Sequence, residues 1–265
     1  TAYGVAVASK FLSVGSVVPA VRLGTGAVAT QAMARIAYKN EVLSALARGA
    51  TAGRALAAAT ADDLAAAHRQ VGVVGPKDAA TFTGSECLPW AGGLTGELEG
   101  TAYAIQGNLL VGRAVIEAME AAFVAGADQP FTRRLVAALL AGDEAGGDAR
   151  GRQSAALYAV APRAGYDRSG VLADLRVDDH EQAPQELARI HDLHDLYFGG
   201  PEGVQPLLGA LEREVRAALD GLGFVGGSTA ADLERWIGVV NLETRHSRDG
   251  IDARVLAHLR AADAG

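Results

Sequence analysis

Two short runs of glycine, alanine and valine near the start of the chain constrain its fold most. Residues 4–11 read Gly-Val-Ala-Val-Ala-Ser-Lys-Phe, and residues 24–31 read Gly-Thr-Gly-Ala-Val-Ala-Thr-Gln. Small and β-branched residues in short runs between glycines are typical of closely packed strands. The first run reaches polar Ser9 and Lys10, and the second ends in polar Gln31. We therefore expect a sheet whose edge carries polar side chains suited to chemistry.

The composition bounds the kind of protein and its partners. The chain has 265 residues, enough for one large domain plus a small appendage. Its formal charge of -7 argues against a nucleic-acid partner. Hydrophobic residues make up 49%, but no apolar run approaches the length of a membrane span, so we expect no membrane partner. The single Cys87 excludes an internal disulfide, and we expect it to behave as a small buried hydrophobe.

The sequence constrains the cellular location and the oligomeric state of the protein less than it constrains its fold. No charged-then-apolar signal segment precedes Thr1, so a cytoplasmic protein is the simpler expectation. The alanine-rich composition permits a homo-oligomer, which is common among proteins of this kind. Self-association is therefore an expectation that the composition permits.

The order of the predicted elements favours a layered α+β fold. Strands come early, paired helices follow, and strands return after residue 150. Two sheets covered by helices on both outer faces, the four-layer αββα sandwich, would have this order. A capping Thr60 is expected to start a helix. Strands are expected at 70–74, 79–83, 102–106, 154–162 and 175–178, and helices at 40–48, 64–68, 110–124, 131–141 and 184–197.

The chain changes character near Gly199. The residues beyond it predict three helices, at about 204–222, 229–240 and 252–262. About sixty residues suffice for a small helical module, although such a module is marginally stable alone. We therefore expect two domains, an αββα domain over 1–198 and a small helical domain over 199–265.

The densest polar cluster lies at residues 146–155, Gly-Gly-Asp-Ala-Arg-Gly-Arg-Gln-Ser-Ala. Arg150 and Arg152 could clamp a carboxylate, and Asp148 and Gln153 complete this candidate substrate-binding group. The alternative is a solvated turn held by structural Asp–Arg pairs. The segment lacks the lysine and the spacing of a phosphate loop, so no nucleotide cofactor is expected.

Two other polar groups carry weaker signals. Gln106-Gly107-Asn108 follows a predicted strand, and an amide side chain beside a glycine amide can build an oxyanion hole. The alternative is that Asn108 caps the helix after it. The residues 178–180, Asp-Asp-His, and the pair His191 and His194 are candidate metal ligands, but their spacings also occur on ordinary surfaces. We expect no metal.

Five segments together resemble a known family. They are residues 4–11, 24–31, 106–108, 146–155 and 175–180, and they agree in order and spacing with the bacterial family catalogued as domain of unknown function 1028. That family is grouped with the N-terminal-nucleophile (Ntn) hydrolases. The tail resembles a peptidoglycan-binding-like module through residues 208–209, 236–238, 241–245 and 251–252.

The resemblance implies hydrolysis of a small amide or peptide without a cofactor. In an Ntn hydrolase the α-amine of the first residue serves as base for its own side chain, which makes Thr1 the nominal nucleophile. Lys10 would support the nucleophile and Asn108 would receive the oxyanion. Ser9 and Gln31, at the strand ends, complete the candidate catalytic group.

The start of the chain departs from the family pattern. Family members carry a full strand and a turn before the segment equivalent to Gly4, and the three residues here are roughly ten too few for such a strand. Thr1 then corresponds to a turn, and the nucleophile would lie upstream. The alternatives are a non-catalytic protein that binds a carboxylate through the Arg/Gly-rich loop, and a cell-wall-associated module located by its tail.

Overall fold

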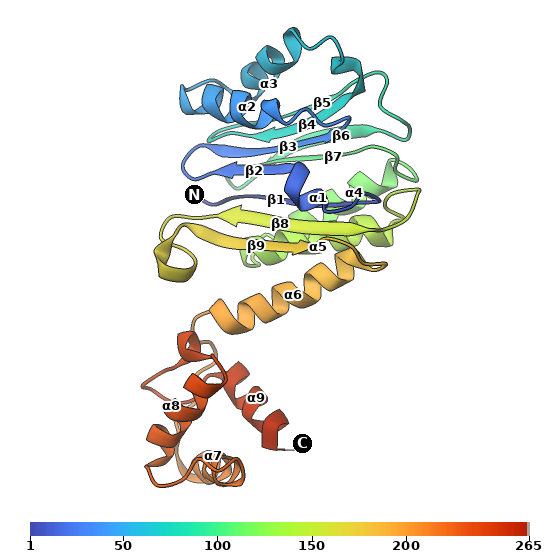
Figure 1. The fold of residues 1–265 in the computed structure, drawn as a ribbon. Helices are drawn as coiled ribbons and strands as arrows, with labels where there is room; N and C mark the ends of the chain where they lie inside the picture. The colour runs from blue at the N-terminus through green and yellow to red at the C-terminus, as the bar shows by residue number, and fades with distance from the viewer. Residues whose placement is uncertain (264–265) are drawn as a thin grey trace. The chain divides into compact units, whose positions relative to one another are not determined.

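The computed structural model describes residues 1–263 and has a mixed α+β fold (Figure 1). The chain divides into two compact units, Thr1–His191 and Asp192–Gly265. The α+β class expected from the order of elements is confirmed. Among the described residues, no helix is long and apolar enough to cross a membrane.

The first unit contains three antiparallel sheets, with strand orders β1-β8-β9, β2-β3-β4-β5 and β6-β7. The β1–β8 register places Tyr3 opposite Val160 and Ser9 opposite Ser154. The strands are β1 Tyr3–Ser9, β2 Pro19–Arg22, β3 Gly26–Ala32, β4 Arg69–Val74, β5 Ala79–Thr83, β6 Gly92–Leu98, β7 Thr101–Gly107, β8 Ser154–Val160 and β9 Val171–Val177.

Helices pack against these sheets in pairs. In the first pair, α2 and α3 bury Tyr38, Val42 and Leu56 against the β2–β5 sheet. In the second pair, α4 and α5 pack on each other, with α5 against β1 and β8 and α4 against β7. The helices up to residue 198 are α1 Val14–Val17, α2 Ala37–Ala47, α3 Ala52–Ala61, α4 Ala114–Ala125, α5 Phe131–Glu144 and α6 Ala183–Phe198.

The structure corrects one predicted helix and adds two strands, β2 and β6, that were not predicted. The helix predicted after a capping Thr60 is wrong, because Thr60 lies near the end of α3. The helix α3 begins at Ala52, and the side chain of Thr51 caps it by accepting a hydrogen bond from the Arg54 N–H at 3.2 Å. Alanine has the highest helix propensity, and it extends the helix through this segment. The strand β6 was not predicted, since Gly-Gly-Leu-Thr-Gly-Glu-Leu has few β-branched residues.

Three strands end at the same edge of the first unit. Tyr3 packs with Ala27 near their starts, and Val5 and Val7 pack with Ala29 further along, so β1 and β3 run in the same direction. The end of β3 and the end of β7 are both hydrogen-bonded to Gln70, at the start of β4. Polar residues that follow β1, β3 and β7 therefore meet at one edge.

The second unit is a helical module. Its helices are α7 Gly209–Gly221, α8 Thr229–Val239 and α9 Ala253–Asp263. They enclose a core that includes Leu219, Trp236 and Leu256. All three predicted helices are present. The helix α7 begins at Gly209 and not near residue 204, because Pro206 lies in the stretch between them and does not fit inside a helix.

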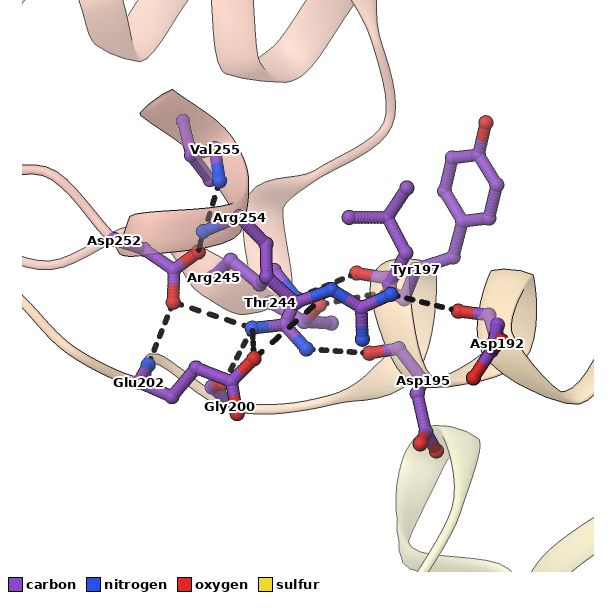
Figure 2. Close-up of polar contacts among 11 residues, drawn as sticks. Asp192, Asp195, Tyr197, Gly200, Glu202, Thr244, Arg245, Asp252, Arg254 and Val255 are labelled. Carbon is purple, nitrogen blue, oxygen red and sulfur yellow. Dashed lines mark hydrogen bonds and ion pairs between the residues drawn. The ribbon is translucent and has the colours of Figure 1, made fainter. Parts of the chain in front are cut away.

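A buried arginine organises the second unit (Figure 2). Arg245 is only 2% exposed. Its Nε donates to the carbonyl oxygen of Leu196 at 2.7 Å and its Nη2 to that of Asp195 at 2.5 Å. Its Nη1 donates to the carbonyl of Gly200 at 3.1 Å. The last carbonyls of a helix have no partner within the helix, so Arg245 satisfies the C-terminal end of α6.

The carboxylate of Asp252 completes this cluster (Figure 2). Its Oδ2 accepts from Arg245 Nη1 at 3.2 Å and from the Glu202 N–H at 2.6 Å. Its Oδ1 accepts from the N–H groups of Arg254 and Val255 at 2.8 and 2.9 Å, which caps the start of α9. The tail residues Arg245 and Asp252 therefore act inside the module.

We predict that Arg245→Met destabilises the second unit by about 3–5 kcal/mol, because it leaves Asp252 buried without its cation. Urea unfolding followed by the fluorescence of Trp236 in a Trp90→Phe background measures the effect. Arg248→Met, an exposed site in the same segment, is the control and should change stability by less than about 0.5 kcal/mol. Equal unfolding midpoints for the two variants would contradict the assigned role.

A second ionic cluster joins α2 to β4. Asp63 Oδ2 accepts from Tyr38 Oη at 2.7 Å and from Arg69 Nε at 3.1 Å, and Oδ1 accepts from the Ala65 N–H at 3.0 Å. These bonds, from Tyr38 first and Arg69 second, lower the pKa of Asp63 from 3.8 to about 2. Burial, and then the bond to Asp63, raises the pKa of Tyr38 to about 12.

The lowered pKa predicts a pH-dependent stability. Because Asp63 has a lower pKa when folded than when unfolded, its carboxylate stabilises the fold above about pH 4 and loses this effect as the pH falls toward 2. Asp63→Asn should therefore unfold at lower urea than wild type at pH 7, with a difference that shrinks between pH 4 and 2. Asp62→Asn, which removes a neighbouring exposed charge, is the control. A difference that stays constant with pH would refute the linkage.

Candidate functional site

A cavity of about 1180 Å³ opens inside the first unit. The strand β1 lines it along its whole length, as does the segment 100–110, which contains β7. Side chains of α4 and α5, among them Phe123 and Leu139, cover one face. At one end lie Thr1, Gly75 and Pro76, and at the other lie Ser9, Gln31, Asn108, Asp148 and Arg152. We call the second end the Ser9 end.

A buried glutamine organises the Ser9 end. Gln70 has no exposed surface. Its Nε2 donates to the carbonyl oxygens of Gly107 and Gly92 at 2.8 and 3.2 Å and lies 3.0 Å from Thr83 Oγ1. Because carbonyl oxygens only accept, these contacts fix which end of the Gln70 amide is nitrogen.

The fixed orientation of the Gln70 amide sets the orientation of the side-chain amides of Gln31 and Asn108. Its Oε1 accepts from Gln31 Nε2 at 2.9 Å and from Asn108 Nδ2 at 3.1 Å. An oxygen cannot donate, so both neighbours must present their NH₂ groups to it. Each NH₂ group has a second hydrogen, and both residues line the cavity. The alternative role for Asn108 as a helix cap does not apply, because α4 begins at Ala114.

The Arg/Gly-rich loop closes the same end through internal ion pairs. Arg150 contacts Asp148 through Nη2 at 2.7 Å and Nε at 3.0 Å. Arg152 Nε donates to Asp143 at 2.5 Å, and Gln185 Nε2 donates to the other Asp143 oxygen at 2.6 Å. The two arginine side chains remain 45% and 43% exposed, so part of each guanidinium faces solvent.

These contacts shift the ionisation of the loop. Burial alone raises the pKa of Asp148, but hydrogen bonds from Arg150 and from the Lys10 N–H outweigh it and hold that pKa below its usual range. The same carboxylate raises the pKa of Arg150, and the bond to Asp143 raises the pKa of Arg152. The Asp148–Arg150 pair therefore stays charged at neutral pH, as the structural-turn alternative requires.

The backbone N–H groups of the loop glycines already donate hydrogen bonds within the protein. The N–H groups of Gly146, Gly147 and Gly151 donate to carbonyl oxygens of Asp143, Gly142 and Asp148 at 2.9–3.0 Å. All three glycines have positive φ angles, between 55° and 112°. Their backbone shape is thus special, but these amides are not free to hold an anion, so a carboxylate ligand would rely on the arginine side chains.

Lys10 fastens this loop to the end of β1. Its backbone N–H donates to Asp148 Oδ2 at 3.2 Å, and its Nζ donates to the carbonyl oxygen of Arg152 at 3.3 Å. Ser9 lines the cavity, whereas Lys10 and Gln153 lie outside the lining. Gln153 Nε2 donates to Asp179 Oδ1 at 3.1 Å instead. Support of a nucleophile by Lys10 stays a prediction.

Thr1 does not join the other candidate catalytic residues. It lies before β1, whereas Ser9 ends that strand, and a seven-residue strand is roughly 20 Å long. Thr1 lines the opposite end of the cavity. The structure therefore groups Ser9, Gln31 and Asn108 with the 148–152 loop and leaves Thr1 apart, because strand geometry separates the two ends of β1.

Sequence reasoning missed three residues that shape the Ser9 end. They are Gln70, Asp143 and Ser154, all buried. Ser154 Oγ accepts from the Val14 N–H at 2.9 Å and donates to the carbonyl of Phe11 at 2.5 Å, which fixes the turn after β1. A polar residue directly before an apolar strand run, as Gln70 stands before Val71, is the signal that could have found the first of them.

Comparisons with known proteins agree with this division of the chain. The family described as "Family of unknown function (DUF1028)" matches residues 1–187, and the one described as "Putative peptidoglycan binding domain" matches residues 197–259. A comparison with curated proteins gave no match.

A solved structure supports the first assignment. The crystal structure of protein SPO2555 from Silicibacter pomeroyi, described under the same DUF1028 family, is 30% identical to this chain. The similarity covers 80% of this chain and 86% of that one, with a TM-score of 0.64. Together with the match over residues 1–187, this places the chain in the DUF1028 family, with a peptidoglycan-binding-like module after it.

Proposed function

We propose that the first unit is an amidohydrolase or peptidase that acts on a small amide or peptide at the Ser9 end of the cavity. The observation that carries the proposal is the pair of amide donors, Gln31 and Asn108, held by the buried Gln70. Both donors line the cavity, at the end where three strands terminate.

These donors suit the charge that develops in amide hydrolysis. Attack on the carbonyl carbon places negative charge on its oxygen, and preorganised N–H groups stabilise that charge. Gln70 fixes both amides before a substrate arrives, so little reorganisation is needed at the moment of reaction. The NH₂ groups of Gln31 and Asn108 would thus form the oxyanion site.

The attacking oxygen must reach the same end. Among the described residues, the Ser9 hydroxyl lines the cavity there. In the Ntn arrangement, the nucleophile is instead the first residue of the mature chain, and its α-amine takes the proton. In both cases the oxygen attacks the carbonyl carbon, the C–N bond breaks and the amine leaves with a proton. Water then hydrolyses the resulting ester to the carboxylic acid.

The rim of the Ser9 end indicates the kind of substrate. Phe11, Met33 and Leu88 line the cavity and are 50%, 61% and 60% exposed. Exposed apolar side chains gathered at a cavity are typical of ligand sites. The partly exposed Arg150 and Arg152 offer N–H groups to a carboxylate. A substrate with an apolar acyl group and a free carboxylate, such as an N-acyl amino acid or a short peptide, fits both features.

The way in which sheets and helices are layered in the first unit supports the resemblance to Ntn hydrolases. The strand β4 packs on β7 and β5 packs on β6, so two sheets face each other. The helices α2 and α3 pack on β3 to β5, and α4 and α5 pack on β7 and β1 (Figure 1). We propose that these four layers form an αββα sandwich of the Ntn type. One fold hosts many functions, so the site residues carry more weight than the layers.

The tail bears on where such an enzyme would work. Its similarity to a peptidoglycan-binding domain favours association with the cell wall over the cytoplasm expected from the sequence. Wall peptides contain amide bonds that the first unit could hydrolyse. Because Arg245 and Asp252 are engaged inside the module, binding would use the exposed residues of the tail.

We predict that Asn108→Ala lowers kcat for amide hydrolysis by about 100- to 1000-fold, because it removes one oxyanion donor. The release of amine from a panel of N-acyl amino acids and dipeptides, detected with fluorescamine, measures the activity. Asn40→Ala, an exposed asparagine on α2, is the matched control and should keep full activity. Ser9→Ala then tests whether the nucleophile is Ser9.

Binding without catalysis is the second candidate, favoured by the partly exposed guanidinium groups of Arg150 and Arg152. If no substrate of the panel releases amine, but N-acyl amino acids bind in calorimetry and Arg152→Ala weakens that binding, the protein is a carboxylate-binding protein. Equal activity of wild type and Asn108→Ala would instead reject the proposed oxyanion site.

A further inference from the structure

We propose that Arg152 binds the free carboxylate of the substrate, that Asp143 and Gln185 position it, and that the first unit therefore cleaves the amide bond next to that carboxylate. This inference rests on the proposed hydrolysis and narrows it to one substrate class, N-acyl amino acids and the C-terminal bond of short peptides. Interior peptide bonds, which have no carboxylate beside them, would be poor substrates.

The two arginines of the loop differ in how many N–H groups they have left for a ligand. A guanidinium has five N–H donors. Arg150 uses two nitrogens on one carboxylate, since its Nε and Nη2 both donate to Asp148, at 3.0 and 2.7 Å. Arg152 uses only its Nε, which donates to Asp143 at 2.5 Å. Among the described residues, neither Nη group of Arg152 has a hydrogen-bond partner, and these two groups form the fork that recognises a carboxylate.

The carboxylate of Asp143 is a rigid support for this guanidinium. Asp143 lies near the end of α5, with 9% of its surface exposed. One of its oxygens takes Arg152 Nε, and the other takes Gln185 Nε2 at 2.6 Å. Gln185 belongs to α6, so two helices hold the carboxylate. A side chain supported by helices is placed more precisely than one that is paired within its own loop, as Arg150 is.

The orientation of Gln185 favours a role in placement over a role in folding. Its Oε1 is buried and has no hydrogen-bond partner within the described part of the chain. The reverse orientation would place this oxygen against Asp143, where both atoms accept and neither donates. A buried oxygen without a donor costs at least as much free energy as one hydrogen bond contributes. The stabilisation from the bond between Gln185 and Asp143 is thereby offset.

The loop places Arg152 close to the candidate nucleophile. The Gln153 N–H donates to the carbonyl oxygen of Ser9 at 3.2 Å, so Arg152 is one residue away from this partner of Ser9. At the other end of the loop, the Ala149 N–H donates to the carbonyl oxygen of the residue after Asn108, at 2.7 Å. The loop therefore spans from the proposed oxyanion donor to the candidate nucleophile.

This placement selects the amide bond beside the carboxylate. In an N-acyl amino acid, three covalent bonds separate the scissile carbonyl carbon from the carboxylate carbon, which keeps the two within roughly 4 Å. Each further residue of an extended chain would add about 3.3 Å. A bond in the interior of a peptide therefore has its chain end too far from Arg152. The apolar rim of Phe11, Met33 and Leu88 would receive the acyl group.

Equilibrium binding tests the proposal without turnover. The probe is the ketomethylene analogue of N-acetylleucine, in which a CH₂ group replaces the amide N–H, so that there is no C–N bond to cleave. Its free acid and its primary carboxamide are each titrated into the protein by calorimetry. Wild type should bind the acid about 10-fold or more tightly than the carboxamide, because only the acid offers a charged acceptor to Arg152.

Substitutions separate the two arginines of the loop. Arg152→Lys keeps the charge but loses the planar fork, so the preference for the acid should fall about 10-fold. Arg150→Lys should lower it by less than about 3-fold, because the N–H groups of Arg150 serve Asp148. Arg176→Lys, on an exposed arginine paired with Asp174, is the matched control and should bind as wild type does. An equal loss for both loop variants, or no preference in wild type, would overturn the proposal.

The positioning role of Asp143 has its own readout. Asp143→Asn keeps an oxygen for Arg152 Nε and should retain the preference for the acid, whereas Asp143→Leu has no acceptor and should lose it. A merely structural role would weaken the binding of acid and carboxamide alike. Gln185→Met removes the unpaired oxygen, so it should leave the urea midpoint unchanged and still weaken binding of the acid. An unchanged preference in Asp143→Leu would overturn the positioning role.

Failure of this inference and failure of the proposed function give different results. If the substrate panel releases amine but the acid and the carboxamide bind equally, the hydrolase stands and the assignment of Arg152 is wrong. If the acid binds with the expected preference but no amine is released, the carboxylate site stands and the hydrolase does not.

Discussion

The common direction of β1, β3 and β7 is the constraint on which the candidate site depends. Because the three strands end at one edge, Ser9, Gln31 and Asn108 converge although they are up to about a hundred residues apart in the chain. The register of β1 with β8 adds the 148–152 loop, which leads into Ser154 opposite Ser9. A reversal of any one strand would carry its polar end to the far side of the cavity.

Fully satisfied buried polar groups specify each unit. In the first unit, Gln70 bonds to carbonyl oxygens through its nitrogen and orients two other amides through its oxygen. In the second, Arg245 satisfies the end of α6 and the carboxylate of Asp252. A buried polar group without partners is costly, so each network permits one arrangement of the segments around it. The Gln70 network leaves amide hydrogens for a ligand, whereas Arg245 is committed to the fold.

Many residues of the candidate site were predictable from the sequence, but their hydrogen-bond and ion-pair partners were not. Strand-end polar residues such as Gln31 and Asn108 are visible in the sequence because the apolar runs stop there. Asp148, Arg150 and Arg152 were predicted together, and the structure shows that each arginine already has a carboxylate partner. Gln70 was missed because its partners lie 13 to 39 residues away in the chain. Asp143 was missed although one partner, Arg152, is near in the chain, because its second partner, Gln185, lies 42 residues away. The grouping of Thr1 with Lys10 ignored the length of the strand between them.

Local patterns in the chain are enough to predict the α+β class, the helical tail and most strands, because hydrophobic periodicity and turn residues act over a few neighbours. They also indicate which polar residues stand at strand ends. Three features emerge from the three-dimensional arrangement alone: β1 and β7 both line one cavity, Gln70 orients Asn108, and Arg245 is buried inside the second unit. These features depend on contacts between segments far apart in the chain, and such contacts form only when strand direction and helix packing are fixed.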